Sequence, residues 1–466
     1  MSSSPLRTQA PSARLRLASY GGMLLAAGLL FLGIRALGVS LSAPAPASSQ
    51  SAFPHVTAAS AQPELLFHVL LALTVIVVAA RVAGALFSRL HQPPVMGEVL
   101  AGIFLGPSVL GRVWPQAQGF LLPADISPAL AAIAQVGVLL YMFLVGLELN
   151  PTLLRGRAQA TLAVSHSSIV LPFTLGAALS LYLYPRYSSA DVPFTVFALF
   201  IGVSMSVTAF PVLARILSDR GLTQTALGAL ALACAAIDDI TAWCLLAFVV
   251  GVTRARLGGA ALTLSLAVVY LAAMLLLVRP LISRLVARQE REEDVSRGVL
   301  TVLMVALLVS ALVTESIGIH ALFGAFLVGA IIPHDSALAR RVAGKLEDVV
   351  VVLLLPAFFA YTGLRTQLGL LTSARDFAVV GLIVAVASLG KFGGTFVAAR
   401  FTGINIRDAA TLGALMNTRG LMELIVLNVG LDLRVLSPTL FAMLVLMAVV
   451  TTLASTPLVD ALHRHA

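Results

Sequence analysis

Charged residues are scarce in this sequence. Only 11% of the 466 residues are Asp, Glu, Lys or Arg, whereas a soluble domain carries about 25%. Apolar residues make up 59% of the chain, and its mean hydropathy is +0.99. The shortage of charge excludes a water-soluble fold for most of the chain and predicts a membrane protein.

Cysteine is nearly absent as well. Cys234 and Cys244 fall in a single apolar stretch, which argues against a disulfide framework. The eight histidines show no metal-ligand spacing, so we expect no cofactor. The net charge of +9 is explained by Lys and Arg in the loops that set the orientation of the protein in the membrane. We therefore expect no nucleic-acid partner.

Apolar stretches of the length that crosses a bilayer, about 20 residues, recur along nearly the whole chain. We expect an all-α polytopic membrane protein with about 13 core transmembrane helices plus one N-terminal helix. The expected spans are roughly 18–38, 63–88, 95–111, 127–148, 159–183, 193–217, 222–250, 259–279, 298–316, 319–333, 347–364, 377–399, 408–431 and 436–461.

Basic residues indicate which side of the membrane each loop faces. Lys and Arg gather in the loops at 154–157, 279–297 and 340–345. Since cytoplasmic loops are enriched in these residues, we expect both termini in the cytoplasm and a multi-pass protein of the bacterial inner membrane.

The first 62 residues form an N-terminal extension ahead of a core that covers 63–466. Basic residues, an apolar stretch and small residues follow one another up to about residue 45, a pattern shared by retained helices and cleaved signal peptides. Both alternatives stay open. The Ala/Pro/Ser-rich segment at 43–62 is expected to be a flexible linker.

The core contains traces of an internal duplication. The segment 97–107 is echoed by 320–333, 144–149 by 360–366, and 204–217 by 415–427. Pro211 interrupts the segment 204–217, and Gly420 loosens the segment 415–427. Because an odd number of spans separates the partners, the halves have opposite orientations. The pattern predicts inverted repeats with two crossing discontinuous helices, which is typical of secondary transporters.

Two adjacent acids, Asp238 and Asp239, lie near the middle of the expected span 222–250. A charge at the bilayer centre costs at least ~2.5–3.5 kcal/mol, so the pair needs compensation. Lys391 is a candidate salt-bridge partner. Neighbouring helical residues point about 100° apart, so one acid can pair with Lys391 while the other binds a monovalent cation or a proton, with the Thr208 hydroxyl and nearby carbonyls as further ligands.

The same residues are compatible with other functions. An Asp–Lys pair can simply hold two helices together. A cation channel can also line its pore with acids, but no selectivity-filter loop is present. An intramembrane aspartyl protease needs its acids on separate helices, so we expect no enzyme. A sodium-coupled organic-anion symporter of the same general fold is the closest competing function.

Several motifs carry a resemblance to a known family. They are "LHQPPVMGEVLAGIFLGPSVLG", "LLYMFLVGLELN", "SMSVTAFPVLARIL", "ACAAIDDITAWCLLA", "GAFLVGAIIPHD", "KFGGT" and "MNTRGLMELIVLNVG". From about residue 63 to the C-terminus the chain resembles the second monovalent cation:proton antiporter family, which includes Kef-type systems and plant cation/proton exchangers. The resemblance implies the sodium/proton antiporter fold, elevator-type exchange of Na⁺ or K⁺ for H⁺, and a homodimer.

Carried over residue by residue, the resemblance makes Asp239 the cation and proton carrier, with Asp238 beside it and Lys391 as coupling partner. The discontinuous-helix elements are Ser206, Thr208, Pro211, Asn417, Arg419, Gly420 and Glu423. Arg419 and Glu423 are four residues apart, so they either form an intrahelical pair or neutralise half-helix ends.

The chain departs from many relatives at Asp238, where Kef-type and plant proteins have a neutral polar residue. Two acids with a lysine are the constellation of electrogenic sodium/proton antiporters, which suggests two protons per sodium. The Kef-type C-terminal nucleotide-binding domain is not expected here. The choice between Na⁺ and K⁺ does not follow from the sequence.

Overall fold

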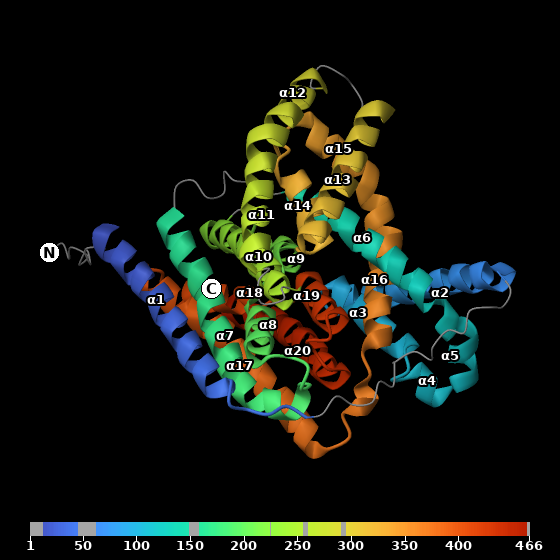
Figure 1. Ribbon diagram of the computed structural model, residues 1–466, viewed down its shortest axis with the longest axis horizontal. Coiled ribbons are helices and arrows are strands. Elements are labelled where there is room, and N and C mark those ends of the chain that lie inside the picture. The colour runs from blue at the N-terminus through green and yellow to red at the C-terminus, as the bar shows by residue number, and fades with distance from the viewer. Residues whose placement is uncertain are drawn as a thin grey trace.

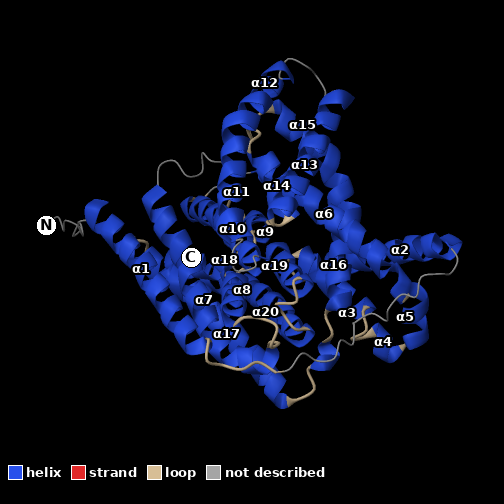
Figure 2. Ribbon diagram, viewed as in Figure 1, coloured by secondary structure: helices blue, strands red, loops and turns tan. Residues whose placement is uncertain are grey.

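The computed structural model describes residues 13–44, 62–148, 158–223, 225–254, 260–289 and 295–463. Within these ranges every regular element is a helix and there are no strands (Figures 1 and 2). The predicted all-α class is therefore confirmed.

Each expected span falls on one helix or on consecutive helices. Their bounds are α1 (Ala13–Gly38), α2 (Gln62–Arg89), α3 (Pro94–Leu105), α4 (Leu110–Val113), α5 (Pro115–Leu121), α6 (Ser127–Glu148), α7 (Ala158–Tyr187), α8 (Phe194–Ser206), α9 (Phe210–Asp219), α10 (Ala226–Arg254), α11 (Ala260–Ala273), α12 (Arg279–Gln289), α13 (Arg297–Ile317), α14 (Ala321–Ala330), α15 (Ala337–Val349), α16 (Leu355–Arg365), α17 (Ala374–Phe401), α18 (Ile406–Met416), α19 (Leu421–Asp432) and α20 (Pro438–His463).

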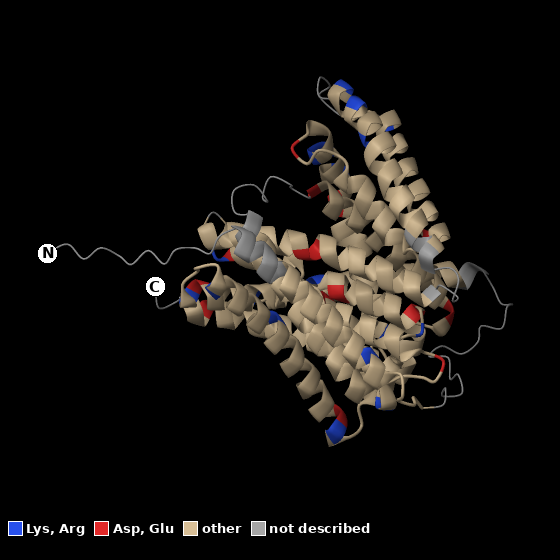
Figure 3. Ribbon diagram, turned by 60° about the vertical axis from the view of Figure 1, so that its left-hand side comes forward, with Lys and Arg blue, Asp and Glu red and all other residues tan. Residues whose placement is uncertain are grey.

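Eleven helical stretches among the described residues are long and apolar enough to cross a membrane. The expected spans at 319–333, 347–364 and 408–431 are not among them, because they fall on helices that are short or interrupted. The expected number of about 13 core spans is thus not confirmed. The multi-pass membrane architecture is confirmed. Most Lys and Arg residues lie toward the ends of helices (Figure 3).

The helices pack in two groups. In the first, the core bundle, α7 packs along α17, and the pairs α8/α9 and α18/α19 pack with α10 and α20. In the second, the outer bundle, α3 packs against α2 and α16, while α14 packs against α13 and α6. Figure 1 shows these groups side by side, with α7, α8, α17 and α20 in one and α3, α6, α14 and α16 in the other.

Glycines allow the closest helix crossings of the outer bundle. A Cβ on Gly363 of α16 would lie 2.2 Å from the Gly102 carbonyl carbon of α3. A Cβ on Gly146 of α6 would lie 2.2 Å from the Phe326 carbonyl oxygen of α14. Since α3 matches α14 and α6 matches α16 in the sequence repeat, the two crossings are counterparts. The predicted inverted repeat is therefore present in three dimensions.

The helix pair α8/α9 is broken at residues 207–209, and Pro211 explains why. A proline ring clashes with the carbonyl four residues earlier, which here is that of Val207. Pro211 itself lies in the first turn of α9, where its missing N–H costs nothing. In the second pair, α18 ends at Met416 and α19 begins at Leu421, after Gly420.

The N-terminal helix α1 packs along the core bundle. The ring of Phe31 lies 5.9 Å from that of Phe173 on α7, and Ile34 is buried. The backbone N–H of Ala190 donates to the Pro44 carbonyl at 3.0 Å. Most of the expected linker, from residue 45 to 61, lies outside the described residues.

Candidate functional site

The two broken helices meet at their breaks. The backbone N–H of Ala209, in the first break, donates to the carbonyl of Thr418, in the second, at 3.1 Å. The Thr208 hydroxyl lies 3.4 Å from the Met416 carbonyl, the last residue of α18. The breaks therefore place unwound backbone from both repeats at one point inside the core bundle, as predicted for crossing discontinuous helices.

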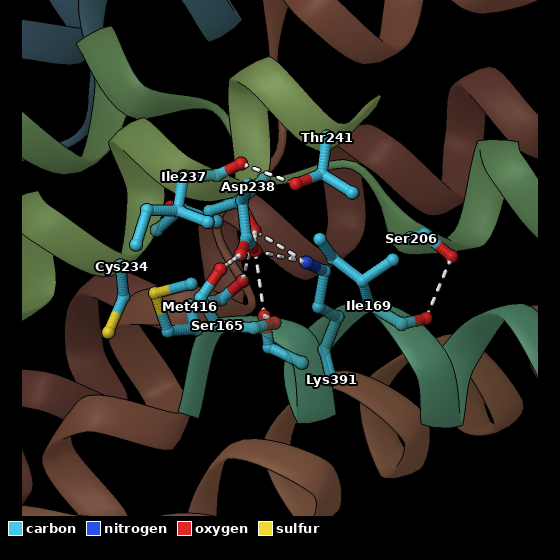
Figure 4. Close-up of polar contacts among 12 residues, drawn as sticks. Ser165, Ile169, Ser206, Cys234, Ile237, Asp238, Thr241, Lys391 and Met416 are labelled. Atoms are coloured by element: carbon cyan, nitrogen blue, oxygen red, sulfur yellow. Dashed lines mark hydrogen bonds and ion pairs between the residues drawn. The ribbon is translucent and has the colours of Figure 1, made fainter. Parts of the chain in front are cut away.

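Asp238 is fully buried at this crossing and is surrounded by donors. Its carboxylate accepts hydrogen bonds from Thr208 at 2.8 Å, from Ser168 at 2.7 Å and from Ser165. The ammonium of Lys391, also fully buried, lies 3.0 Å from Oδ2 of Asp238. Figure 4 shows Ser165 and Lys391 converging on this carboxylate. The expected ion pair is present, and Asp238 is saturated with partners.

Asp239 is also buried, with 4% of its surface exposed, but it is poorly satisfied. Among the described residues, its Oδ1 has no hydrogen-bond partner. The backbone N–H of Phe210, the first residue of α9, donates to the carboxylate, so the positive end of a half-helix faces this acid. The two adjacent carboxylates therefore differ sharply: one is locked in a network and the other is open to a ligand.

Thr208 lies in the network around Asp238, and its role as a cation ligand stays a prediction. Its hydroxyl donates to Asp238 and accepts from the Lys391 ammonium at 2.5 Å. The break at 207–209 turns this side chain toward the lysine. In this structure Thr208 is part of the Asp238–Lys391 network.

Arg419 and Glu423 form a fully buried ion pair within the second broken helix. The guanidinium of Arg419 also donates to the carbonyls of Ser204 and Met205, at 3.0 and 2.8 Å. These carbonyls belong to the last turn of α8, which has no intrahelical donors left for them. Both alternatives for Arg419 therefore hold together, because it pairs with Glu423 and neutralises the end of the other half-helix.

The remaining predicted elements shape the breaks. Ser206 ends α8 and donates to the carbonyls of Gly202 and Ile169, at 2.7 and 3.1 Å (Figure 4). Asn417 directs its amide toward the Ser388 hydroxyl at 3.4 Å, and its Oδ1 has no partner. A Cβ on Gly420 would lie 2.8 Å from Val212 of α9. Glycine at this position therefore allows the two helix breaks to lie close to each other.

Close approach of α7 and α17 brings Lys391 to Asp238. A Cβ on Gly390 would lie 2.7 Å from the Cα of Pro172, and one on Gly394 would lie 2.5 Å from the Ser167 carbonyl. Glycines on both sides of Lys391 thus set its distance from α7, the helix that carries Ser165 and Ser168. These two serines are not among the predicted site residues, although their spacing of three residues within an apolar span is a visible signal.

The geometry leaves Asp239 as a buried carboxylate with an unpartnered oxygen. Such a group can bind either a proton or a hard monovalent cation, which prefers oxygen ligands, but not both at one position. Asp238, held by a lysine and three hydroxyls, supplies fixed negative charge next to it.

Comparisons with known proteins agree with this architecture. The transmembrane region of sodium/hydrogen exchangers matches residues 72–461. The chain is 47% identical to the Na(+)/H(+) antiporter NhaS4 of Synechocystis sp., over 84% of this chain and 97% of that protein. It is 40% identical to cation/H(+) antiporter 20 of Arabidopsis thaliana, over 86% of this chain and 49% of that protein.

A solved structure shares the fold. The sodium proton antiporter MjNhaP1 of Methanocaldococcus jannaschii, at pH 8, aligns over 85% of this chain and 97% of its own, with a TM-score of 0.57 and 14% identity. At this identity the likeness concerns the fold alone.

Proposed function

The chain belongs to the sodium/hydrogen exchanger family, and we propose that it exchanges a monovalent cation for protons across the membrane. One observation carries the proposal. At the crossing of the broken helices, Asp238 is saturated with donors while Oδ1 of the buried Asp239 has none. An antiporter needs such a site, since a single carboxylate must hold two ligands in turn.

Asp239 is the proposed carrier. It releases its proton on one side of the membrane and takes up the cation, and the reverse happens on the other side. Asp238 contributes negative charge and Lys391 couples the cycle, because its contact with Asp238 is weakened when a cation approaches. The contacts above and the resemblance to the family support these roles for Asp238, Asp239, Thr208 and Lys391.

Movement of the core bundle against the outer bundle would expose the site alternately. Packing is concentrated within each bundle, so a rigid-body shift of one against the other breaks few contacts. The contact between Arg365 of α16 and Asp432 of α19, at 2.6 Å, is a polar link between them. We therefore favour an elevator-type cycle. The resemblance to the family supports a homodimer.

The stoichiometry and the cation are part of the proposal. Both acids and the lysine are present, which favours exchange of two protons, one carried by Asp239 and one by Lys391, for one sodium and hence an electrogenic cycle. The relatives are named for sodium in one case and for cations in general in the other, so K⁺ is the alternative cargo. A bacterial inner membrane with cytoplasmic termini fits the distribution of basic loops.

Inside-out vesicles or proteoliposomes with an imposed pH gradient test the proposal. A pH dye is followed while Na⁺, K⁺ or Li⁺ is added to wild type, to Asp239→Asn, and to Asp219→Asn as a control. Asp219 lies at the end of α9 with an exposed side chain. We expect cation-dependent dequenching in wild type and the control but not in Asp239→Asn.

The same experiment identifies the cargo. Half-maximal concentrations rank the cations, and the response to an imposed membrane potential tests electrogenicity. A wild-type protein that responds to no cation would refute the exchange function. An equal response in Asp239→Asn would remove Asp239 from the carrier role.

A further inference from the structure

Two serines of α7 bind Asp238 independently of the lysine. Ser165 donates to Oδ1 of the carboxylate, and Ser168 donates to Oδ2 at 2.7 Å. Both serines are fully buried. Being three residues apart, they lie on one face of the helix. Asp238 therefore keeps two charge-assisted hydrogen bonds that involve neither Lys391 nor Thr208.

The Ser168 hydroxyl has two acceptors for one proton. It lies 2.7 Å from Oδ2 of Asp238 and 2.7 Å from the backbone carbonyl of Ser165. Because a hydroxyl carries a single donor hydrogen, the carbonyl of its own helix and the carboxylate compete for the Ser168 proton. It is thus a donor that can turn fully toward Asp238 when positive charge beside Asp238 is withdrawn.

Thr208 cannot serve in the same way. Its hydroxyl accepts from Lys391 and donates to Asp238, so its orientation depends on the lysine. It also belongs to a helix break. The serines lie inside the continuous helix α7, where their positions do not depend on the state of the lysine.

We propose that Ser165 and Ser168 are positioning residues that hold the Asp238 carboxylate in place while Lys391 leaves it, an inference that rests on the proposed exchange function. A cation bound at Asp239 brings a second positive charge beside Lys391, so the lysine must move away or release its proton. A buried carboxylate left with fewer donors is costly. The serines lower that cost and thereby ease cation binding.

The charged and titratable groups around this network remain unchanged when the serines are replaced. Lys391 experiences the charges of Asp238, Arg419 and Glu423. The charge of Asp238 interacts electrostatically with Asp239 and with the Cys234 thiol, which lies one turn earlier in α10. Removing a serine hydroxyl alters only the neutral donors to Asp238, so a shift in pH dependence can be assigned to them.

The test uses the full chain in proteoliposomes with an imposed pH gradient. The apparent cation KM and the pH profile of exchange are measured for Ser165→Ala, Ser168→Ala and the double variant. The matched control is Ser180→Ala, since Ser180 is fully buried in the same helix and donates only to the Gly176 carbonyl, at 3.0 Å. Ser168→Thr restores a hydroxyl.

In the double variant we expect the cation KM to rise about tenfold, from the loss of hydrogen bonds to a charged group. Its pH profile departs from that of Ser180→Ala, because the carboxylate next to the proposed carrier has lost two hydrogen-bond donors. Ser180→Ala keeps the wild-type values, and Ser168→Thr lies closer to wild type than Ser168→Ala.

The outcomes separate this inference from the function on which it rests. If wild type exchanges no cation, the exchange function and the inference both fail. If wild type exchanges cations while the serine variants match Ser180→Ala in KM and pH profile, the inference is wrong and the function stands. If the double variant does not fold, the single variants and Ser168→Thr are compared with Ser180→Ala in KM and pH profile, and the inference stands or fails on that comparison.

Discussion

Asp238→Asn and Asp239→Asn should have opposite effects, although the two residues are adjacent. Asparagine keeps the shape of the side chain and removes its charge. In Asp238→Asn the buried Lys391 loses its counter-charge at 3.0 Å, and breaking one side of a buried pair costs roughly 3–5 kcal/mol. We therefore expect a clear loss of stability.

Asp239→Asn removes a charge that has no strong partner. Its Oδ1 has no hydrogen bond, and the neighbouring Asp238 repels it. The substitution should therefore leave stability unchanged or increase it, while exchange is abolished because the carrier is gone.

Thermal unfolding of the purified variants in detergent measures stability, and dye-based exchange in proteoliposomes measures transport. The expected order of unfolding temperature is Asp239→Asn at or above wild type, with Asp238→Asn well below both. Equal unfolding temperatures for the two variants, or a lower one for Asp239→Asn, would refute the assignment of Asp238 as the satisfied acid and Asp239 as the open one.

Three further predictions concern the scaffold. Gly363→Ala should destabilise the chain by roughly 1–3 kcal/mol through overpacking, because the new methyl would lie 2.2 Å from the Gly102 carbonyl carbon. The control Gly381→Ala, where a Cβ would meet nothing within 4 Å, should be neutral. Equal unfolding temperatures for the two variants would argue against this helix crossing. Arg419→Lys should impair both folding and exchange, since lysine cannot reach Glu423 and the two carbonyls of α8 together, and full activity in this variant would show that those contacts are dispensable. Lys391→Met should slow exchange and change its response to membrane potential, and unaltered electrogenic exchange would exclude a coupling role for Lys391.

Much of this protein is determined by local sequence. Long apolar stretches specify membrane helices because a buried backbone must satisfy its own hydrogen bonds, and Pro211 breaks its helix through a clash four residues away. The repeat was visible at 97–107 and 320–333. Asp238, Asp239 and Lys391 stood out because charge inside a bilayer is rare.

Only the tertiary structure decided how these residues divide their partners. Ser165 on α7, Thr208 in the break between α8 and α9, and Lys391 on α17 reach Asp238 across sequence separations of 73, 30 and 153 residues. Arg419 likewise neutralises the end of α8, 214 residues away. Hydrophobic periodicity reports whether a residue is buried but not which distant group it meets. Which aspartate is satisfied and which is free follows from the approach of α7, α17 and the two breaks, a property of packing that no local pattern encodes.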